Sequence, residues 1–76
     1  MVEIKIYSEP ITLGQFLKFL GLIYSGGECK TFLFENDILV NGIEEKRRGK
    51  KLFAGDLVVI NGKKYLLVLE NDNKKN

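Results

Sequence analysis

The spacing of apolar residues changes along the chain and predicts its elements in order. Val2, Ile4 and Ile6 alternate with charged residues, which is the period of a half-buried strand. Apolar residues then recur at helical spacing, as Leu13, Phe16, Leu17 and Leu20. A second helical stripe follows at Cys29, Phe32 and Leu33. The pattern therefore predicts a strand, two short helices and, from residue 38 onward, a series of strands.

Polar residues mark where each helix begins. Thr12 and Gln15 have the spacing of a capping box, in which each residue satisfies a free backbone N–H group of the other. Ser25 and Glu28 repeat this spacing before the second stripe. The second helix is therefore expected to begin at position 26 or 27.

Glycine and asparagine mark the ends of both helices. Gly21 follows the first stripe and is a natural stop for that helix. Asn36 or Asp37 is expected to end the second helix, because asparagine tolerates the left-handed conformation that such a stop often needs.

Two Asn-Gly pairs, at 41–42 and 61–62, predict tight hairpin turns. Strands are expected at 38–40, 57–60 and 65–69, with a turn at 55–56. The predicted fold class is α+β, a two-helix hairpin packed on a small, mostly antiparallel sheet of about four to five short strands. Residues 1–70 are expected to form a single domain, and the polar segment 71–76 a disordered tail.

Composition excludes several classes of function. The chain has 76 residues, of which 45% are hydrophobic and 29% charged, as in an ordinary soluble domain. No apolar run approaches the ~20 residues of a membrane span, and the first residues lack the apolar stretch of a signal peptide. We therefore expect a cytoplasmic protein that does not bind membranes.

The chain has one cysteine and no histidine. A disulfide within the chain, a zinc site and histidine-based catalysis all need more than this. Cys29 is on an apolar stripe, so it is expected to be a buried small hydrophobe. We expect no catalysis, no cofactor, no metal and no small-molecule substrate.

Positive charge is concentrated in one segment, although the net charge is only +2. The basic run comprises Lys46, Arg47, Arg48, Lys50 and Lys51. One interpretation is a solvated hairpin tip that keeps a strand edge from pairing. The other is a set of phosphate contacts to a nucleic acid.

Residues 12–59 resemble the RNA-binding domain named after ribosomal small-subunit protein four, the S-four or αL domain. The matching residues of the first helix and its exit are Leu13, Phe16, Leu17, Gly21 and Leu22. Those of the second helix and the turns are Ser25, Glu28, Lys30, Val40, Asn41, Gly42, Gly55 and Asp56. With an additional N-terminal strand at 2–6, the chain is similar to the small stand-alone bacterial proteins of the YaaA/YbcJ type.

The resemblance implies the αL fold and non-catalytic binding of structured RNA, either ribosomal RNA or a ribosome precursor. We expect a monomer whose second helix and basic hairpin contact phosphates. The expected RNA-binding residues are Ser25, Gly26, Lys30, Asn41, Lys46, Arg47, Arg48, Lys50 and Lys51. Because the start of a helix presents free N–H groups, Ser25 and Gly26 are expected to receive a phosphate there.

The chain departs from the family pattern at charged positions. Thr12 and Gly26 stand where the family usually has arginine. Asn36 replaces the glycine that ends the second helix, and Asp37 replaces a basic residue. Lys30 is then the one cation that carries over on this helix.

Aromatic residues leave a second function open. Phe34 shares a helix face with Gly26 and Lys30, where it either stacks on a base or packs under the hairpin. An exposed Phe34 would also suit a protein-interaction adaptor, which is the alternative function. Phe19 and Tyr24 are expected at the rim of the core, and Lys18 as a solvated lysine.

Overall fold

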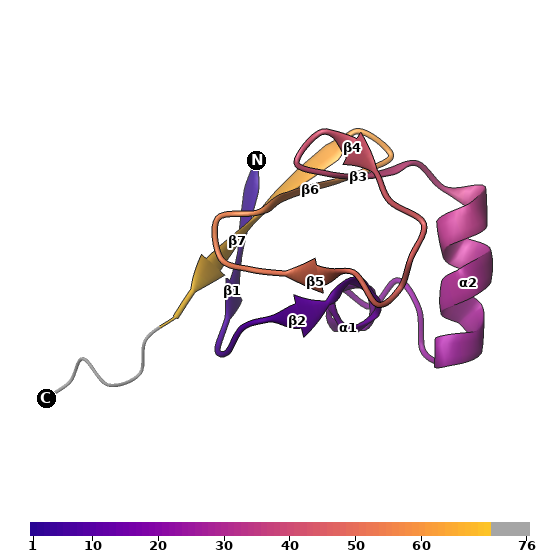
Figure 1. The fold of residues 1–76 in the computed structure, drawn as a ribbon, viewed down its shortest axis with the longest axis horizontal. Helices are drawn as coiled ribbons and strands as arrows, with labels where there is room; N and C mark the ends of the chain where they lie inside the picture. The colour runs from indigo at the N-terminus through magenta and orange to yellow at the C-terminus, as the bar shows by residue number, and fades with distance from the viewer. Residues whose placement is uncertain (71–76) are drawn as a thin grey trace, which may run out of the picture.

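A computed structural model describes residues 1–70, and their elements follow the predicted order (Figure 1). The elements are β1 (Val2–Ile6), β2 (Ile11–Thr12), α1 (Leu13–Phe19), α2 (Gly26–Glu35), β3 (Ile38–Val40), β4 (Ile43–Glu44), β5 (Lys51–Leu52), β6 (Leu57–Ile60) and β7 (Lys63–Leu69). The α+β class is confirmed. The tail expected at 71–76 lies outside the described residues.

The main sheet has five strands in the order β1-β7-β6-β3-β4. Its inner pairs are antiparallel, as predicted, whereas β1 lies parallel to β7 with Val2 opposite Tyr65. A second, two-stranded sheet joins β2 to β5 and was not predicted. Strands of two residues are too short to show a period in the sequence.

Both predicted helix starts are confirmed. Thr12 Oγ1 accepts the N–H of Gln15 at 3.1 Å, and Gln15 Oε1 accepts the N–H of Thr12 at 2.8 Å. At the start of α2, the Glu28 carboxylate accepts the N–H of Ser25 at 3.0 Å. These contacts satisfy backbone donors that have no partner inside a helix.

The two helices end in different ways. Gly21 directly follows Leu20, the C-cap of α1. Its φ of +78° is a left-handed conformation suited to glycine. Asn36 ends α2 as predicted, but its φ of −125° is extended rather than left-handed, so the predicted reason is wrong. Instead, Asn36 Nδ2 donates to the carbonyl of Phe32 at 2.9 Å. The side chain thus satisfies a helix carbonyl while the chain turns into β3.

The core lies between one face of the main sheet and the two helices. It consists of Ile6, Leu13, Phe16, Leu17, Ile23, Cys29, Leu33, Ile38, Val40, Leu52, Val58, Ile60 and Leu67. Phe16 lies edge-on to Tyr65 with ring centroids 6.0 Å apart. Burying each large side chain contributes roughly 1.5–3 kcal/mol, so short elements are held mainly by this shared core.

Cys29 is buried, as expected. Neither helix within residues 1–70 is long and apolar enough to cross a membrane.

Candidate nucleic-acid interface

The basic run connects the two sheets and does not form a hairpin. β4, before the run, pairs with β3. Lys51, the last residue of the run, begins β5 and lies opposite Thr12 of β2. The prediction of a hairpin tip is therefore wrong, because the end of the run pairs with β2 and not with β4. Its carbonyls accept the first N–H groups of α1, Leu13 to Lys50 at 2.8 Å and Gly14 to Arg48 at 2.9 Å. The backbone of the run is thus anchored to the start of α1.

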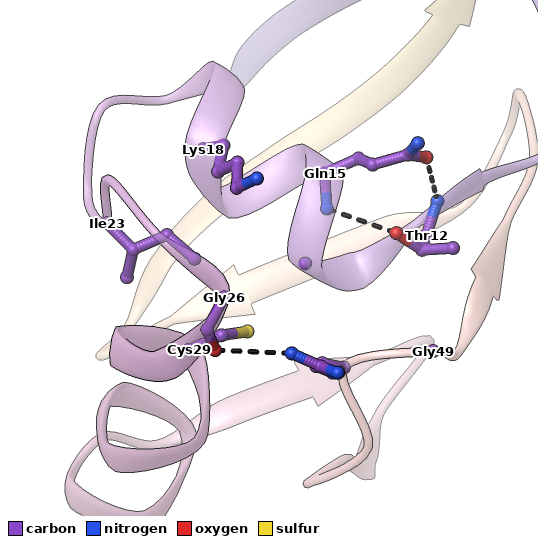
Figure 2. A pocket seen from close by; sticks show the side chains of 9 residues that line it. Thr12, Gln15, Lys18, Ile23, Gly26, Cys29 and Gly49 are labelled. Atoms are coloured by element: carbon purple, nitrogen blue, oxygen red, sulfur yellow. Dashed lines mark hydrogen bonds between the residues drawn. The ribbon is translucent and has the colours of Figure 1, made fainter.

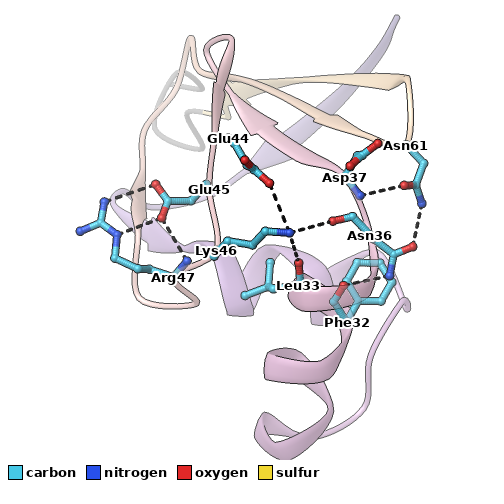
Figure 3. Close-up of polar contacts among 9 residues, drawn as sticks. All are labelled: Phe32, Leu33, Asn36, Asp37, Glu44, Glu45, Lys46, Arg47 and Asn61. Atoms are coloured by element: carbon cyan, nitrogen blue, oxygen red, sulfur yellow. Dashed lines mark hydrogen bonds and ion pairs between the residues drawn. The ribbon is translucent and has the colours of Figure 1, made fainter.

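Arg47 is held by the protein itself (Figure 3). Glu45, only 8% exposed, accepts the backbone N–H of Arg47 at 3.0 Å, its Nε at 2.9 Å and its Nη2 at 3.3 Å. The Arg47 side chain, by donating to this carboxylate, lowers the pKa of Glu45. The same contact raises the pKa of Arg47.

Lys46 reaches the end of α2. Its Nζ donates to the carbonyls of Leu33 at 2.8 Å and Asn36 at 3.4 Å, and lies 3.4 Å from a Glu44 carboxylate oxygen (Figure 3). A cation is favourable here because the last carbonyls of a helix are unpaired and carry partial negative charge. Lys46 therefore caps α2.

Arg48 reaches the start of the same helix. Its Nη1 donates to the carbonyl of Gly26 at 3.3 Å. A Cβ atom added at Gly26 would lie 2.9 Å from this nitrogen, which is too close for a carbon. A side chain at residue 26 would therefore require the Arg48 guanidinium to shift.

Two adjoining hollows share Gly26 and Arg48. One, of about 240 Å³, lies between the helices and is also lined by Gln15, Lys18 and Cys29 (Figure 2). The other, of about 450 Å³, is also lined by Lys30, Leu33 and Lys46. We call the surface formed by Lys18, Lys30 and Arg48 the cation groove. Its three cations come from α1, α2 and the basic run.

Lys18 was absent from the predicted site. It is exposed, as expected of a solvated lysine, but it lines the same hollow as Arg48. Burial raises the pKa of the Cys29 thiol beneath them, while the charges of Arg48 and Lys18 act in the opposite direction. The proximity of Lys18 to Arg48 depends on tertiary packing, so the sequence carried no local signal for it.

The remaining predicted residues differ in their surroundings. Lys51 is exposed on β5 and Lys50 is half-buried just before it. Within the described chain, no salt bridge is formed by Lys30, Arg48, Lys50 or Lys51. The Asn41 side chain is engaged within the protein, because Nδ2 donates to Asp56 at 3.0 Å and Oδ1 accepts the N–H of Leu57 at 2.9 Å.

The structure settles where the aromatic side chains lie. Phe34 is 80% exposed, so it does not pack under a hairpin. Phe19 and Tyr24 were expected at the rim of the core, but they are 65% and 84% exposed. Both lie outside the apolar stripes, whose side chains already fill the space above the sheet.

No group of three or more potential metal ligands gathers within residues 1–70.

The chain is similar to a named bacterial protein. It is 54% identical over 59 residues to the probable ribosome maturation protein RlbA of Bacillus subtilis (strain 168). The match covers 78% of this chain and 83% of that protein. No solved structure matches the chain significantly.

The family comparison covers nearly all of the described fold. The family model for the S4 domain matches residues 4–68, from β1 to β7. The expected resemblance to the S-four domain is therefore confirmed, and this chain belongs to the S4 domain family.

Proposed function

We propose that this protein binds structured RNA without catalysing a reaction, and that phosphates of the RNA dock in the cation groove. The observation that carries the proposal is the convergence of Lys18, Lys30 and Arg48 on two adjoining hollows. Ribosomal RNA or a ribosome precursor is the proposed target, and the cytoplasm the proposed location.

The comparisons support a ribosome-related RNA-binding role at the level of the family. The chain belongs to the S4 domain family, and its Bacillus subtilis relative is named as a probable ribosome maturation protein. RNA in ribosomes and their precursors is folded and largely A-form. Such RNA is recognised through its shape and its phosphates more than through base edges.

The groove suits phosphate docking because its cations are held apart by different elements. Lys18 is on α1, Lys30 on α2, and Arg48 on a run whose backbone is hydrogen-bonded to α1. Because these elements are packed against one another, the cations they carry favour one range of phosphate spacings, which selects a shape of RNA rather than a sequence. The free N–H groups at the start of α2, near Ser25 and Gly26, add favourable dipoles.

Arg48 also compensates for a departure from the family pattern. Gly26 stands where the family usually has an arginine, and the Arg48 guanidinium lies beside the position that a side chain at residue 26 would fill. We assign to Arg48 the phosphate contact that the missing arginine would make. The cation then comes from the basic run instead of from the helix.

The other predicted residues take supporting roles in this proposal. Lys50 and Lys51 extend the positive surface from the groove along β5. Lys46 and Arg47 hold the run in place, since their charged groups already have partners in the protein. Asn41 orders its turn through Asp56 and Leu57.

The test is the affinity for a folded ribosomal-RNA fragment across a salt series. Arg48→Gln is compared with Lys63→Gln, which removes the same charge at the Asn61-Gly62 turn. We expect log K to fall linearly with log salt, and Arg48→Gln to reduce that slope by about one. Lys63→Gln should leave the slope unchanged. No binding at low salt, or equal slopes for both variants, would refute the proposal.

The exposure of Phe34 favours one alternative, a protein-interaction adaptor. An adaptor would bind through an apolar contact, so its affinity would depend weakly on salt. Phe34→Ala would then abolish binding to the partner, and Arg48→Gln would not. RNA binding predicts the reverse order of effects, with Phe34→Ala costing only the stacking of one base.

A further inference from the structure

The main sheet has a second apolar face, which neither α1 nor α2 covers. Along each strand, alternate side chains point to opposite faces. Val58, Ile60 and Leu67 point into the core, so their neighbours point away from it. The outward residues include five aliphatic side chains, Leu39, Leu57, Val59, Leu66 and Val68. We call these five the outer patch.

The outer patch is one continuous surface. Leu39 lies opposite Val59, and Leu57 opposite Leu66, so cross-strand pairs join β3, β6 and β7. All five are half-buried, yet among residues 1–70 none belongs to the core or packs against it. Both helices and the small sheet contribute to the core on the other face. A contiguous apolar face of this kind marks an interaction surface.

The charges around the outer patch are nearly balanced. On the same face, Glu44 lies opposite Leu39 and Lys64 opposite Val59. At the other end, Glu3 lies opposite Leu66 and Lys5 opposite Val68. Lys5 also lies 3.8 Å from a carboxylate oxygen of Glu70, so these residues together carry three acids and two lysines, a net charge of −1. Such a face does not attract a polyanion, which separates it from the cation groove.

We infer that the outer patch binds a second copy of this chain, face to face, in a two-fold symmetric dimer. The patch runs diagonally across the sheet from Leu39 to Val68. The two-fold axis lies in the plane between the two faces and crosses the middle of this diagonal at a right angle. It therefore places each end of the patch against the opposite end of the partner's patch. Lys64 of one protomer then faces Glu3 of its partner, and Glu44 comes near Lys5. Each contact occurs twice, as in any two-fold interface.

Lys64 and Glu3 are free to make this contact between protomers. Within the described residues, neither Lys64 nor Glu3 forms a salt bridge. Two sheets packed face to face at about 10 Å bury the aliphatic side chains between them. The cation groove is built from α1, α2 and the basic run, so the dimer leaves both grooves open. The inference stands without the proposed function and replaces the expectation of a monomer.

The first test is the molar mass by light scattering or sedimentation, from micromolar to millimolar protein. We expect the mass to rise from 8.7 kDa to twice that value as concentration increases. Leu66→Lys should weaken the dimer at least about tenfold, because two lysines would enter the apolar contact. Ile43→Lys is the matched control, since Ile43 is 72% exposed and lies opposite the inward-facing Val40. It should leave the dimer unchanged.

A charge exchange tests the arrangement even if Leu66→Lys perturbs the fold. Glu3→Lys and Lys64→Glu alter only exposed side chains, and each should weaken the dimer about tenfold because it places like charges together. The double variant should restore the affinity, since the pair is re-formed with its signs exchanged.

Several results would overturn the inference. These are a mass of 8.7 kDa at every concentration, a dimer lost equally in Ile43→Lys, and a double variant weaker than either single one. A monomeric wild type whose RNA affinity falls in Leu66→Lys would also overturn it, and would assign the face to RNA.

Discussion

The two parts of the basic run differ in what surrounds their charges. Lys46 and Arg47 have partners within the protein, the carbonyls that end α2 and the carboxylate of Glu45. Arg48 makes one hydrogen bond, to the Gly26 carbonyl at 3.3 Å, and lines the hollow between the helices. Neither Arg48 nor the lysines that follow it form a salt bridge within residues 1–70. Under the proposed function, the cations before the Arg47–Arg48 boundary stabilise the fold and those after it bind RNA.

The largest expected effect concerns Glu45. Glu45→Ala should lower the free energy of unfolding by about 2 kcal/mol, because the Arg47 backbone N–H and guanidinium lose a nearly buried acceptor. Urea unfolding followed by circular dichroism measures this loss. Glu44→Ala, at an exposed acid one residue earlier, should change stability little. Equal losses for the two variants would contradict the division of the run.

The second effect contrasts Lys46 with Lys50. Lys46→Met keeps the apolar stem but removes the ammonium from the α2 carbonyls, which should cost about 1 kcal/mol of stability. Lys50→Met should leave the unfolding curve nearly unchanged and reduce the salt slope of RNA binding instead. A Lys46→Met protein with normal stability and a reduced slope would place Lys46 in the RNA contact.

Glu45 also predicts a dependence on pH. Its folded-state pKa lies below the ordinary value of 4.5, because Arg47 donates to the charged form. Its stabilisation is therefore complete above pH 4.5 and is lost as pH falls through the lower, folded-state pKa. The stability difference between wild type and Glu45→Gln should shrink below pH 4.5. A difference that stays constant down to pH 3 would show that this carboxylate is not held by charge.

The smallest effect tests the place of Arg48. Gly26→Ala should push the guanidinium away and weaken RNA binding roughly threefold to tenfold. The helix itself should not lose stability, because alanine is a better helix former than glycine. Gly27→Ala is the matched control, as a Cβ there meets nothing closer than 4.0 Å. RNA titrations alongside thermal unfolding separate the two outcomes.

Local signals in the sequence were enough to place the helices and the hairpin turns. Capping residues act on donors three positions away, and both Asn-Gly turns adopt the expected positive φ, at Asn41 and Asn61. The contact between Glu45 and Arg47 was also open to inference. Residues two apart on an extended chain lie on the same side, so this pair had a local signal that was missed.

Long-range features had no such signal. Lys46 contacts the carbonyls at the end of α2, and Arg48 contacts the Gly26 carbonyl at its start. Both contacts depend on the pairing of β5 with β2, which holds the run against the helix. The expectation of a basic hairpin failed for the same reason. The division of the run into two parts is therefore a property of the topology.

The parallel pairing of β1 with β7 has a consequence for the order of folding. Val2 meets Tyr65, so almost the whole described chain must be closed into a loop before these strands pair. Closure of a long loop is slow because its entropy is lost before any contact repays it. We expect β1 to dock last during folding and to exchange its amide hydrogens first in the native state. The helices and the strands β3, β4, β6 and β7 would then form before the edge strand β1 pairs with β7.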